Sequence, residues 1–237
     1  GRLLRALRPD VIHSHGKGAG LYARLLPSSF FNTRRVHSFH GFHPPDGMLS
    51  SFMYRLTESY LLSHTDTVIA ISGGEAAEIR NTFTKGTRVS VIPNAVDCDD
   101  LHSRSLFPLP SDLKSFLSRN AKQFIVTMIG RNDPVKNFDL AFEAARLVLE
   151  KSREICFVFV GINENDAECA KLLNLFPEHV RAISSLDDAA ALINKSNVLL
   201  LTSKKEGSPL VVQEAFCFGK PVVGTNVEGI CESVQHG

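Results

Sequence analysis

The chain has 237 residues, of which 43% are hydrophobic and 22% are charged, and its formal net charge is +1. This composition is typical of a globular chain with one large or two ordinary domains, and the charge gives no reason to expect a nucleic-acid partner. No apolar run approaches the roughly 20 residues of a membrane helix, and we expect the five cysteines to be reduced core residues of a cytoplasmic protein.

Short apolar runs alternate with amphipathic segments along the first part of the chain. The pattern predicts helices over 3–7, 17–26, 49–63 and 74–83, and strands over 10–13, 36–39, 67–71 and 89–92. Alternation of this kind favours a parallel sheet with right-handed crossovers. We therefore predict a partial Rossmann-like domain over 1–92.

The alternation stops over 93–120, where prolines and aspartates occur without a clean period, and this predicts an interdomain linker. It resumes over 121–237, with strands at 124–129, 155–160, 180–183, 198–201 and from 222, and with helices at 138–150, 167–176 and 187–194. The sequence thus predicts an α/β fold of two doubly wound Rossmann-like domains that face a cleft.

One further helix is predicted between the last two strands. Ser208 is expected to cap it, Pro209 to occupy its first turn and Gly219 to end it. Its carboxylate, Glu214, has only apolar residues three and four positions away: Leu210, Val211, Cys217 and Phe218. A buried carboxylate without a partner costs several kcal/mol, so Glu214 is expected to meet a positive group or a polar ligand.

The loop before this helix suits an anion. It offers backbone N–H groups and the positive end of the helix dipole beside Lys204 and Lys205. A ligand that carries both phosphates and hydroxyls would satisfy the loop and Glu214 together. A nucleotide-sugar is such a ligand.

Residues 206–215, Glu-Gly-Ser-Pro-Leu-Val-Val-Gln-Glu-Ala, resemble the paired-glutamate motif of retaining GT-B glycosyltransferases in glycosyltransferase family 4. The Gly-Lys-Pro-Val-Val that starts at Gly219 matches as well. The resemblance implies that Glu214 binds the ribose hydroxyls and Glu206 the donor sugar, while the diphosphate lies on the backbone N–H groups around Gly207, Ser208, Pro209 and Leu210. It covers nearly the whole chain, which is expected to be truncated at both ends.

Gly130 follows a predicted buried strand and opens a loop with two cations, Arg131 and Lys136. Loops in this position bind ligands in open α/β sheets, and two cations match two phosphate charges. The alternative is that Arg131 and Lys136 are ordinary surface cations of a solvated loop. The resemblance favours the diphosphate, because family members carry Gly-Arg and a following Lys here.

Several histidines follow the first two predicted strands. His13 and His15 point the same way on a strand and could bind a metal with His37, His40 or His43, although no acidic cluster lies nearby. The resemblance instead implies that His15 and Gly16 contact ligand at the cleft. It also implies that His40, in a His-Gly pair, hydrogen-bonds to a sugar hydroxyl or a phosphate. No metal is expected.

The resemblance implies a hexosyltransferase-type enzyme that moves a sugar, with retention, from a UDP- or GDP-linked donor to a sugar or lipid-linked sugar acceptor. Polysaccharide or glycolipid biosynthesis at the inner membrane face, with peripheral attachment, is compatible with it. No cofactor is expected besides this donor. The segment 92–97, Ile-Pro-Asn-Ala-Val-Asp, resembles the family's interdomain hinge. A binding module without turnover and a histidine-ligated metal hydrolase remain as alternatives.

Overall fold

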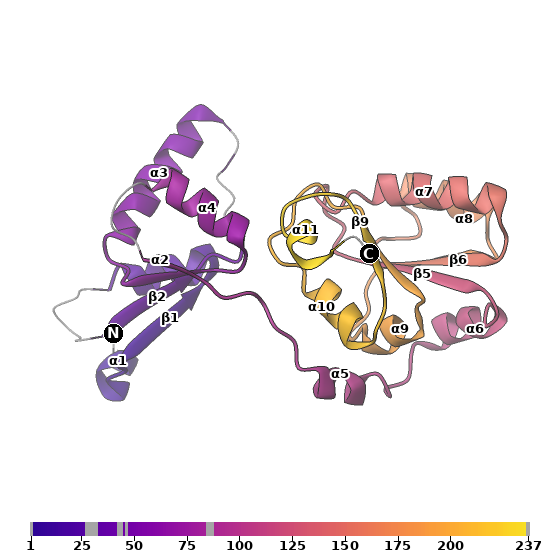
Figure 1. Cartoon of the computed structure of the whole chain (residues 1–237), viewed down its shortest axis with the longest axis horizontal. Coiled ribbons are helices and arrows are strands. Elements are labelled where there is room, and N and C mark those ends of the chain that lie inside the picture. Colours follow the sequence, from indigo (N-terminus) through magenta and orange to yellow (C-terminus); the bar gives the residue numbers. More distant parts are fainter. Residues whose placement is uncertain (1, 27–32, 42–44, 46, 84–87, 236–237) are drawn as a thin grey trace. The chain divides into compact units, whose positions relative to one another are not determined.

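The computed structural model describes residues 2–26, 33–41, 45, 47–83 and 88–235. The chain divides into two compact units, Gly1–Asn94 and Ala95–Gly237, which are described separately below (Figure 1). Both are parallel α/β sheets, and this fold class was predicted from the sequence. Ala95, in the predicted hinge, does not adopt a positive φ.

The first unit contains a parallel sheet of order β1-β2-β3-β4. Its strands are β1 (Val11–His15), β2 (Arg34–Ser38), β3 (Thr67–Ala70) and β4 (Val89–Val91). Its helices are α1 (Arg2–Leu7), α2 (Gly16–Arg24), α3 (Met48–Leu62) and α4 (Gly73–Thr82). All these elements were predicted within a few residues of their bounds, because apolar runs and amphipathic segments alternate clearly here.

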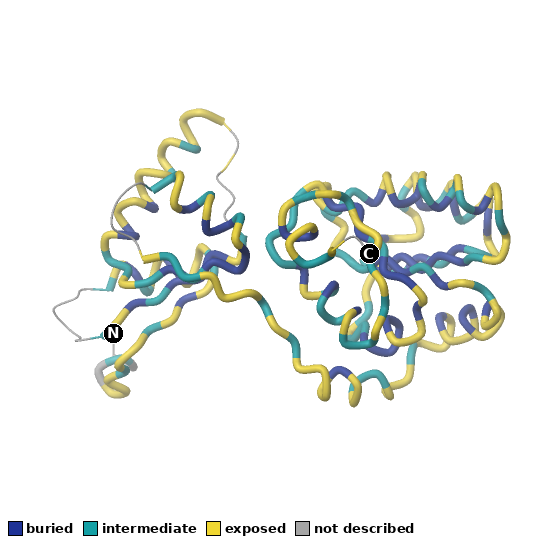
Figure 2. Tube along the Cα trace, viewed as in Figure 1, coloured by how far each residue is buried: buried dark blue, intermediate teal, exposed yellow. Residues whose placement is uncertain are grey.

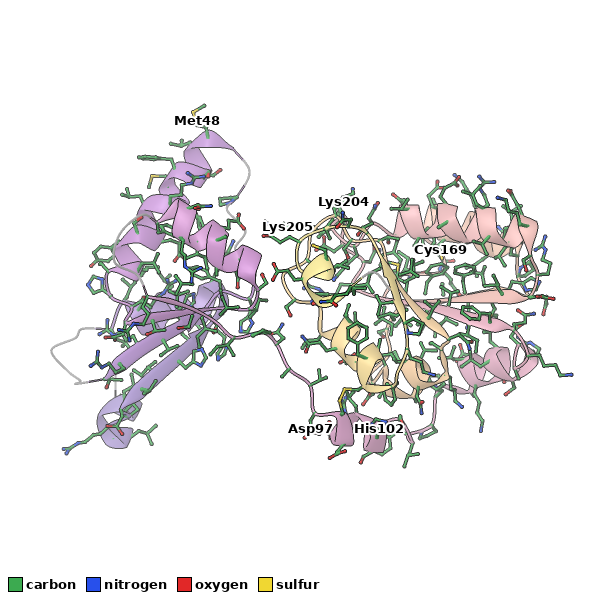
Figure 3. The ribbon with its side chains drawn as sticks, viewed as in Figure 1. Met48, Asp97, His102, Cys169, Lys204 and Lys205 are labelled. Atoms are coloured by element: carbon green, nitrogen blue, oxygen red, sulfur yellow. A yellow bond between two sulfur atoms is a disulfide. The ribbon has the colours of Figure 1, made fainter. Side chains whose placement is uncertain are left out.

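A buried ion pair links α2 to α3 in the first unit. Arg24 donates to Glu58 over 2.8 Å, and their side chains are only 1% and 6% exposed. Phe52, Leu56 and Tyr60, which are spaced four apart along α3, are exposed, so this apolar side of the helix is not its buried side. Met48 at the start of the helix is exposed as well (Figures 2 and 3). The helix is instead anchored through Glu58 and through Leu61 and Leu62 near its end.

The second unit contains a parallel sheet of order β7-β6-β5-β8-β9. Its strands are β5 (Phe124–Ile129), β6 (Ile155–Val160), β7 (Val180–Ile183), β8 (Val198–Leu201) and β9 (Val222–Gly224). Its helices are α5 (Cys98–Arg104), α6 (Ser111–Arg119), α7 (Phe138–Lys151), α8 (Ala167–Leu175), α9 (Ala190–Lys195), α10 (Leu210–Cys217) and α11 (Ile230–Ser233). Helices α7 and α8 pack on one face of the sheet, and α6 and α9 on the other (Figure 1).

The strand order of the second unit reverses between β5 and β8. From β5 the chain builds outward through β6 to β7, and it then returns to the other side of β5 for β8 and β9. The two neighbouring loops at the carboxyl ends of β5 and β8 therefore lead to helices on opposite faces. In open α/β sheets such a reversal is the usual place for a ligand.

The segment 93–120, predicted as a linker, contains α5 and α6. The Asp97 carboxylate caps α5 by accepting the N–H groups of Asp99 and Asp100 over 3.0 and 3.1 Å. Helix α6 buries Leu113 and Phe116 in the same cluster as β5 and β6. Both helices lie in the second unit, so this segment supplies part of that unit's structure.

The prediction of five reduced core cysteines is wrong for three of them. Cys98 on α5 and Cys217 on α10 form a disulfide, and Cys231 is exposed. Cys156 and Cys169 are buried and free, and burial raises the pKa of each thiol to about 11. Among the helices of the described residues, none is long and apolar enough to cross a membrane.

Candidate functional site

Hydrogen bonds connect the loops after β5 and β8 in the second unit. The Thr202 hydroxyl, directly after β8, donates to the carbonyl oxygens of Lys136 and Asn137 over 3.1 and 2.9 Å. The Lys204 N–H donates to the Val135 carbonyl over 2.8 Å. Asn137 adopts a left-handed φ of 55° as the residue that precedes α7. The two loops at the strand reversal therefore form one rigid edge.

Two of the predicted site residues meet at this edge. Lys136 Nζ donates to Glu206 Oε1 over 2.5 Å, and the buried Ser203 hydroxyl donates to the same oxygen over 2.6 Å. The Lys136 side chain lies against Gly130, where an added Cβ would stand 3.3 Å from Lys136 Cγ. Gly130 thus leaves room for the lysine to reach Glu206.

A third loop, which follows β9, closes on the same edge. The Thr225 hydroxyl donates to the Ser203 carbonyl over 2.5 Å. Gly229, at a φ of +77°, approaches the carbonyl oxygens of Glu206 and Gly207 so closely that a side chain at this position would collide with them. The conformation of the Glu206–Gly207 turn is therefore fixed from both sides.

Helix α10 starts one residue later than predicted. Pro209 is its N-cap and makes no side-chain cap bond, and Leu210 is its first residue. The hydroxyl of Ser208 accepts from Gln213 Nε2 over 3.3 Å, so the prediction that Ser208 is the N-cap is wrong. Gly219, at a φ of +63°, follows the helix end as predicted.

Glu214 lies in the middle of α10 and is neither fully buried nor exposed. Burial raises the pKa of its carboxyl, the charge of Arg104 on α5 lowers it, and Asp188 raises it further. Arg104 itself bonds to Asp100 and Asp188 over 2.8 and 2.9 Å. Within the described residues, no hydrogen bond or ion pair to the Glu214 carboxylate is present. Its capacity to accept hydrogen bonds is thus available to a ligand.

Arg131 is exposed at the start of the same loop, one residue after Gly130. Lys204 is exposed in the loop after β8 (Figure 3). Arg131, Lys136 and Lys204 thus place three cationic side chains on the loops after β5 and β8, while Glu206 and Glu214 supply acceptors. Such a combination can bind phosphate oxygens and hydroxyl groups in one ligand.

The predicted histidines of the first unit meet at the carboxyl ends of β1 and β2. The His15 Nδ1 and His40 Nε2 atoms are 2.7 Å apart, and the His13 and His15 rings lie on the same side with their centroids 4.1 Å apart. Partial burial, with the charges of His15 and His40, lowers the pKa of His13. Gly16 directly follows His15 and has a φ of +67°.

His37 is separate from this group. Its side chain is fully buried, its Nδ1 lies 3.0 Å from the Ser14 hydroxyl, and burial together with the Arg24 charge lowers its pKa to about 3. Over the described parts of the chain, no group of three or more His, Cys, Asp or Glu residues is arranged to hold a metal ion. His43 lies outside the described residues.

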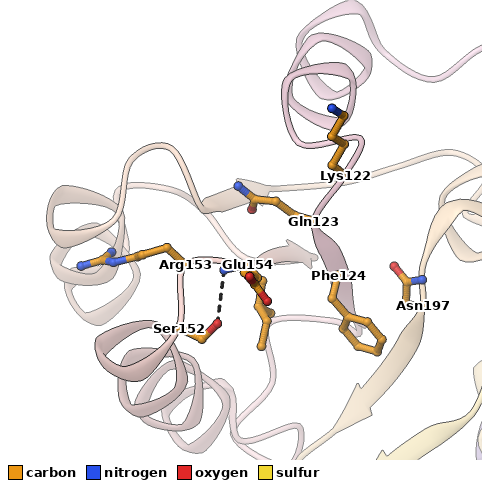
Figure 4. A pocket seen from close by; sticks show the side chains of 8 residues that line it. Lys122, Gln123, Phe124, Ser152, Arg153, Glu154 and Asn197 are labelled. Carbon is orange, nitrogen blue, oxygen red and sulfur yellow. Dashed lines mark hydrogen bonds between the residues drawn. The ribbon is translucent and has the colours of Figure 1, made fainter.

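The second unit also has a hollow of about 920 Å³ at the opposite edge of its sheet (Figure 4). It is lined by residues that precede or begin β5, β6 and β8, among them Lys122, Phe124, Arg153 and Asn197. This edge carries the amino ends of the strands. It contains none of the predicted site residues.

Two family profiles match the chain. The profile for glycosyl transferases group 1 matches residues 111–237, more than half of the chain, and the profile for Glycosyltransferase Family 4 matches residues 1–100. The chain belongs to the glycosyl transferases group 1 family. The resemblance drawn from residues 206–215 is confirmed, and the matched ranges meet near the predicted linker.

Two curated relatives of this chain are named for diphosphoundecaprenol-linked acceptors. The Escherichia coli UDP-Gal:alpha-D-GlcNAc-diphosphoundecaprenol alpha-1,3-galactosyltransferase is 27% identical over 96% of this chain and 60% of its own length. The Campylobacter jejuni N,N'-diacetylbacillosaminyl-diphospho-undecaprenol alpha-1,3-N-acetylgalactosaminyltransferase is 28% identical over 78% of this chain and 47% of its own length. The chain therefore spans about half to three-fifths of the length of these relatives.

Two solved structures share the fold. Anabaena Alr3699/HepE in complex with UDP and glucose has a TM-score of 0.75 at 21% identity, over 96% of this chain and 62% of that one. An alpha,alpha-trehalose-phosphate synthase (UDP-forming) from Burkholderia vietnamiensis has a TM-score of 0.80 at 14% identity, over 97% of this chain and 63% of that one. These matches confirm the predicted GT-B fold.

Sequence reasoning did not single out Thr202, which connects the loops after β5 and β8, or Ser203, which bonds to Glu206. A signal for them exists, because both are polar and directly follow the apolar run 198–201 at the carboxyl end of a predicted parallel strand. The structure brings together Lys136, Glu206 and the turn after it. It places His15 and His40 together in the first unit.

Proposed function

We propose that the protein is a retaining glycosyltransferase that moves a hexose from a nucleotide-sugar to an acceptor hydroxyl. The observation that carries this proposal is the contact between Lys136 and Glu206 at the strand reversal of the second unit. A cation, a carboxylate and the turn that leads into α10 lie where open α/β sheets bind ligands. Family membership supports the same reading.

In the proposed reaction the acceptor oxygen bonds to the anomeric carbon of the donor, and the bond from that carbon to the diphosphate oxygen breaks. The leaving diphosphate takes the acceptor proton, which balances the step. Negative charge grows on the diphosphate as the bond breaks. Lys136 and Arg131 are proposed to stabilise that charge, because fixed cations aimed at developing charge lower the barrier.

The remaining site residues have binding roles in this proposal. Glu214 accepts hydrogen bonds from the ribose hydroxyls, and Glu206 contacts the donor sugar. The turn formed by Gly207, Ser208, Pro209 and Leu210 faces the diphosphate. In the first unit, His15, Gly16 and His40 contact sugar or phosphate oxygens. The Lys136–Glu206 pair then exchanges partners when a phosphate enters, and Ser203 keeps Glu206 in place.

We further propose that these cations take the role that a metal ion has in metal-dependent transferases, so that the reaction needs no cofactor besides the donor. UDP-linked donors are favoured, since one curated relative is named as a UDP-Gal transferase and the Anabaena structure contains UDP. The proposed acceptor is a sugar or a lipid-linked sugar, since both curated relatives above are named for diphosphoundecaprenol acceptors. Work at the inner membrane face, by a protein attached there peripherally, is part of this proposal.

Calorimetry with UDP tests the donor site. We expect wild type to bind UDP and Lys136→Met to bind it at least about tenfold more weakly, because a charge-assisted bond contributes roughly 1.5–3 kcal/mol. The matched control is Lys151→Met, an exposed lysine at the other end of α7. Equal loss in both variants, or none in either, contradicts the assignment of Lys136.

Release of UDP from UDP-galactose or UDP-glucose then separates transfer from binding alone. The protein is expected to release UDP faster when an acceptor is present, and Glu206→Gln is expected to slow that release while UDP still binds. UDP binding without any release would identify a nucleotide-binding module, the second function considered from the sequence.

A further inference from the structure

A buried glutamate of the first unit is bonded to the turn that carries His40. Glu75 lies in the first turn of α4 and its side chain is buried. Its Oε1 accepts the Gly41 N–H over 2.6 Å, and its Oε2 accepts the Ile71 N–H over 2.7 Å. The Ser72 hydroxyl accepts the N–H of Glu75 itself over 3.0 Å. Both carboxylate oxygens are thus held by backbone amides.

The turn that Glu75 holds has an uncommon backbone. His40 has a φ of 55° and Gly41 a φ of 109°. A left-handed conformation is unfavourable for a residue with a side chain and persists only where its surroundings fix it. The Gly41 N–H belongs to the peptide that follows His40, so the bond to Glu75 fixes the backbone of His40 directly.

The imidazole of His40 is held from a different direction. Its Nε2 lies 2.7 Å from Nδ1 of His15, at the end of β1. When both rings are neutral, one of these nitrogens donates and the other accepts, so the contact sets the tautomers of the two rings together. The remaining ring nitrogen of His40 is then the one that can meet a ligand.

We propose that Glu75 is a positioning residue for the transfer reaction, because its carboxylate holds Gly41 and thereby aims the His40 ring at the substrate. This inference rests on the proposed function of His40. A carboxylate suits the task, since it accepts two N–H groups at once and makes charge-assisted bonds. The amide of Glu75→Gln can accept only through its oxygen, and its NH₂ group faces an N–H donor.

Kinetics of the full chain test whether Glu75 acts through His40. UDP release from UDP-galactose and UDP-glucose is measured for wild type, Glu75→Gln, His40→Ala and the double variant. We expect Glu75→Gln to lower kcat on the order of tenfold to a hundredfold, since small displacements of an aligned group have effects of this size. In the His40→Ala background the same change is expected to have no further effect. Independent, multiplying losses would overturn the proposal.

A matched control lies on the same helix. Glu78→Gln makes the same chemical change at a partly exposed position of α4, and it is expected to leave kcat unchanged. UDP affinity by calorimetry is expected to be the same for wild type, Glu75→Gln and Glu78→Gln. A Glu75→Gln variant that loses UDP affinity and thermal stability together, with no specific loss of kcat, would show a structural role and refute the proposal.

Magnetic resonance of the histidine rings gives a readout that does not depend on turnover. In protein labelled at histidine, Glu75→Gln is expected to shift the His40 ring signals, while His179 of the second unit stays unchanged. If wild type releases no UDP, the proposed function fails, yet these spectra still decide whether Glu75 holds His40. Unchanged His40 signals would overturn the inference.

Glu75→Asp keeps the test decisive if Glu75→Gln does not fold. The shorter side chain retains the charge and can reach one of the two N–H groups. We expect it to shift the His40 ring signals from their wild-type positions and to give a kcat between those of wild type and His40→Ala. An Asp variant with wild-type spectra and wild-type kcat would contradict the proposed positioning.

Discussion

Loss of the Cys98–Cys217 disulfide is expected to destabilise the second unit strongly. The bond closes a loop with a sequence separation of 119, and its Cα atoms are 5.4 Å apart. In the chain-entropy treatment, a loop of this length restricts the unfolded chain by about 5 kcal/mol, and measured values are often smaller. We therefore expect Cys217→Ser to lower the free energy of unfolding by about 3–5 kcal/mol.

Guanidinium denaturation without reductant measures this change, with Cys231→Ser as the control because Cys231 is an exposed free thiol. Reductant should destabilise wild type and Cys231→Ser by similar amounts and leave Cys217→Ser unaffected. Alkylation of the unfolded, unreduced protein counts the thiols by mass. Modification of all five cysteines in wild type would refute the disulfide and restore the sequence-based prediction.

Three further changes have defined outcomes. Burial raises the pKa of Glu214 above its usual 4.5, so its contribution to stability is present below about pH 4.5 and is lost as pH rises through the folded-state pKa. Glu214→Gln should reduce the pH dependence of the urea unfolding midpoint between about pH 4 and 7. The same pH dependence in the variant and in wild type would contradict this. Gly161 has a φ of +99°, and a Cβ added there would collide with the carbonyl oxygen of Gly130. Gly161→Ala should therefore lower the free energy of unfolding, measured by thermal unfolding, by about 2–4 kcal/mol. Gly18→Ala, with open space around it, should cost nothing, and equal losses would discredit the steric reasoning. Arg24→Met leaves Glu58 buried and unpaired and should cost about 3–5 kcal/mol in urea denaturation, whereas a loss below about 1 kcal/mol would show that water reaches the pair.

The elements that could be predicted are those with a strong local signal. Strands such as 124–129 and 155–160 coincide with the observed bounds of β5 and β6, because an uninterrupted apolar run identifies a strand that is covered on both faces. The end of α10 at Gly219 was also predictable, since a left-handed residue after a helix favours glycine.

The missed elements have mixed signals. Helix α6 carries Leu113, Phe116 and Leu117 at helical spacing, but prolines directly before it made the segment resemble a linker. The Cys98–Cys217 bond joins helices that are far apart in sequence, and no local pattern identifies such a pairing. The Ser208 cap failed by one residue, because Pro209 already has the extended backbone of an N-cap.

The candidate site was predictable as a set of residues but not as a set of contacts. Glu206 and Lys136 were assigned to different parts of one ligand, yet they bond to each other in the structure. Thr202 connects the loop after β8 to the loop after β5 through a hydrogen bond to Asn137, 65 residues away in sequence. Such contacts depend on which strands are neighbours, and the sequence alone does not specify that order.

The most direct test of the central claim is a crystal structure of the full chain with UDP. The claim is that the diphosphate binds at the strand reversal of the second unit, between the loops after β5 and β8. The account predicts phosphate oxygens within hydrogen-bond distance of Lys136 and the ribose hydroxyls at Glu214. UDP bound instead in the hollow at the amino ends of the strands, beside Phe124 and Arg153, would contradict it.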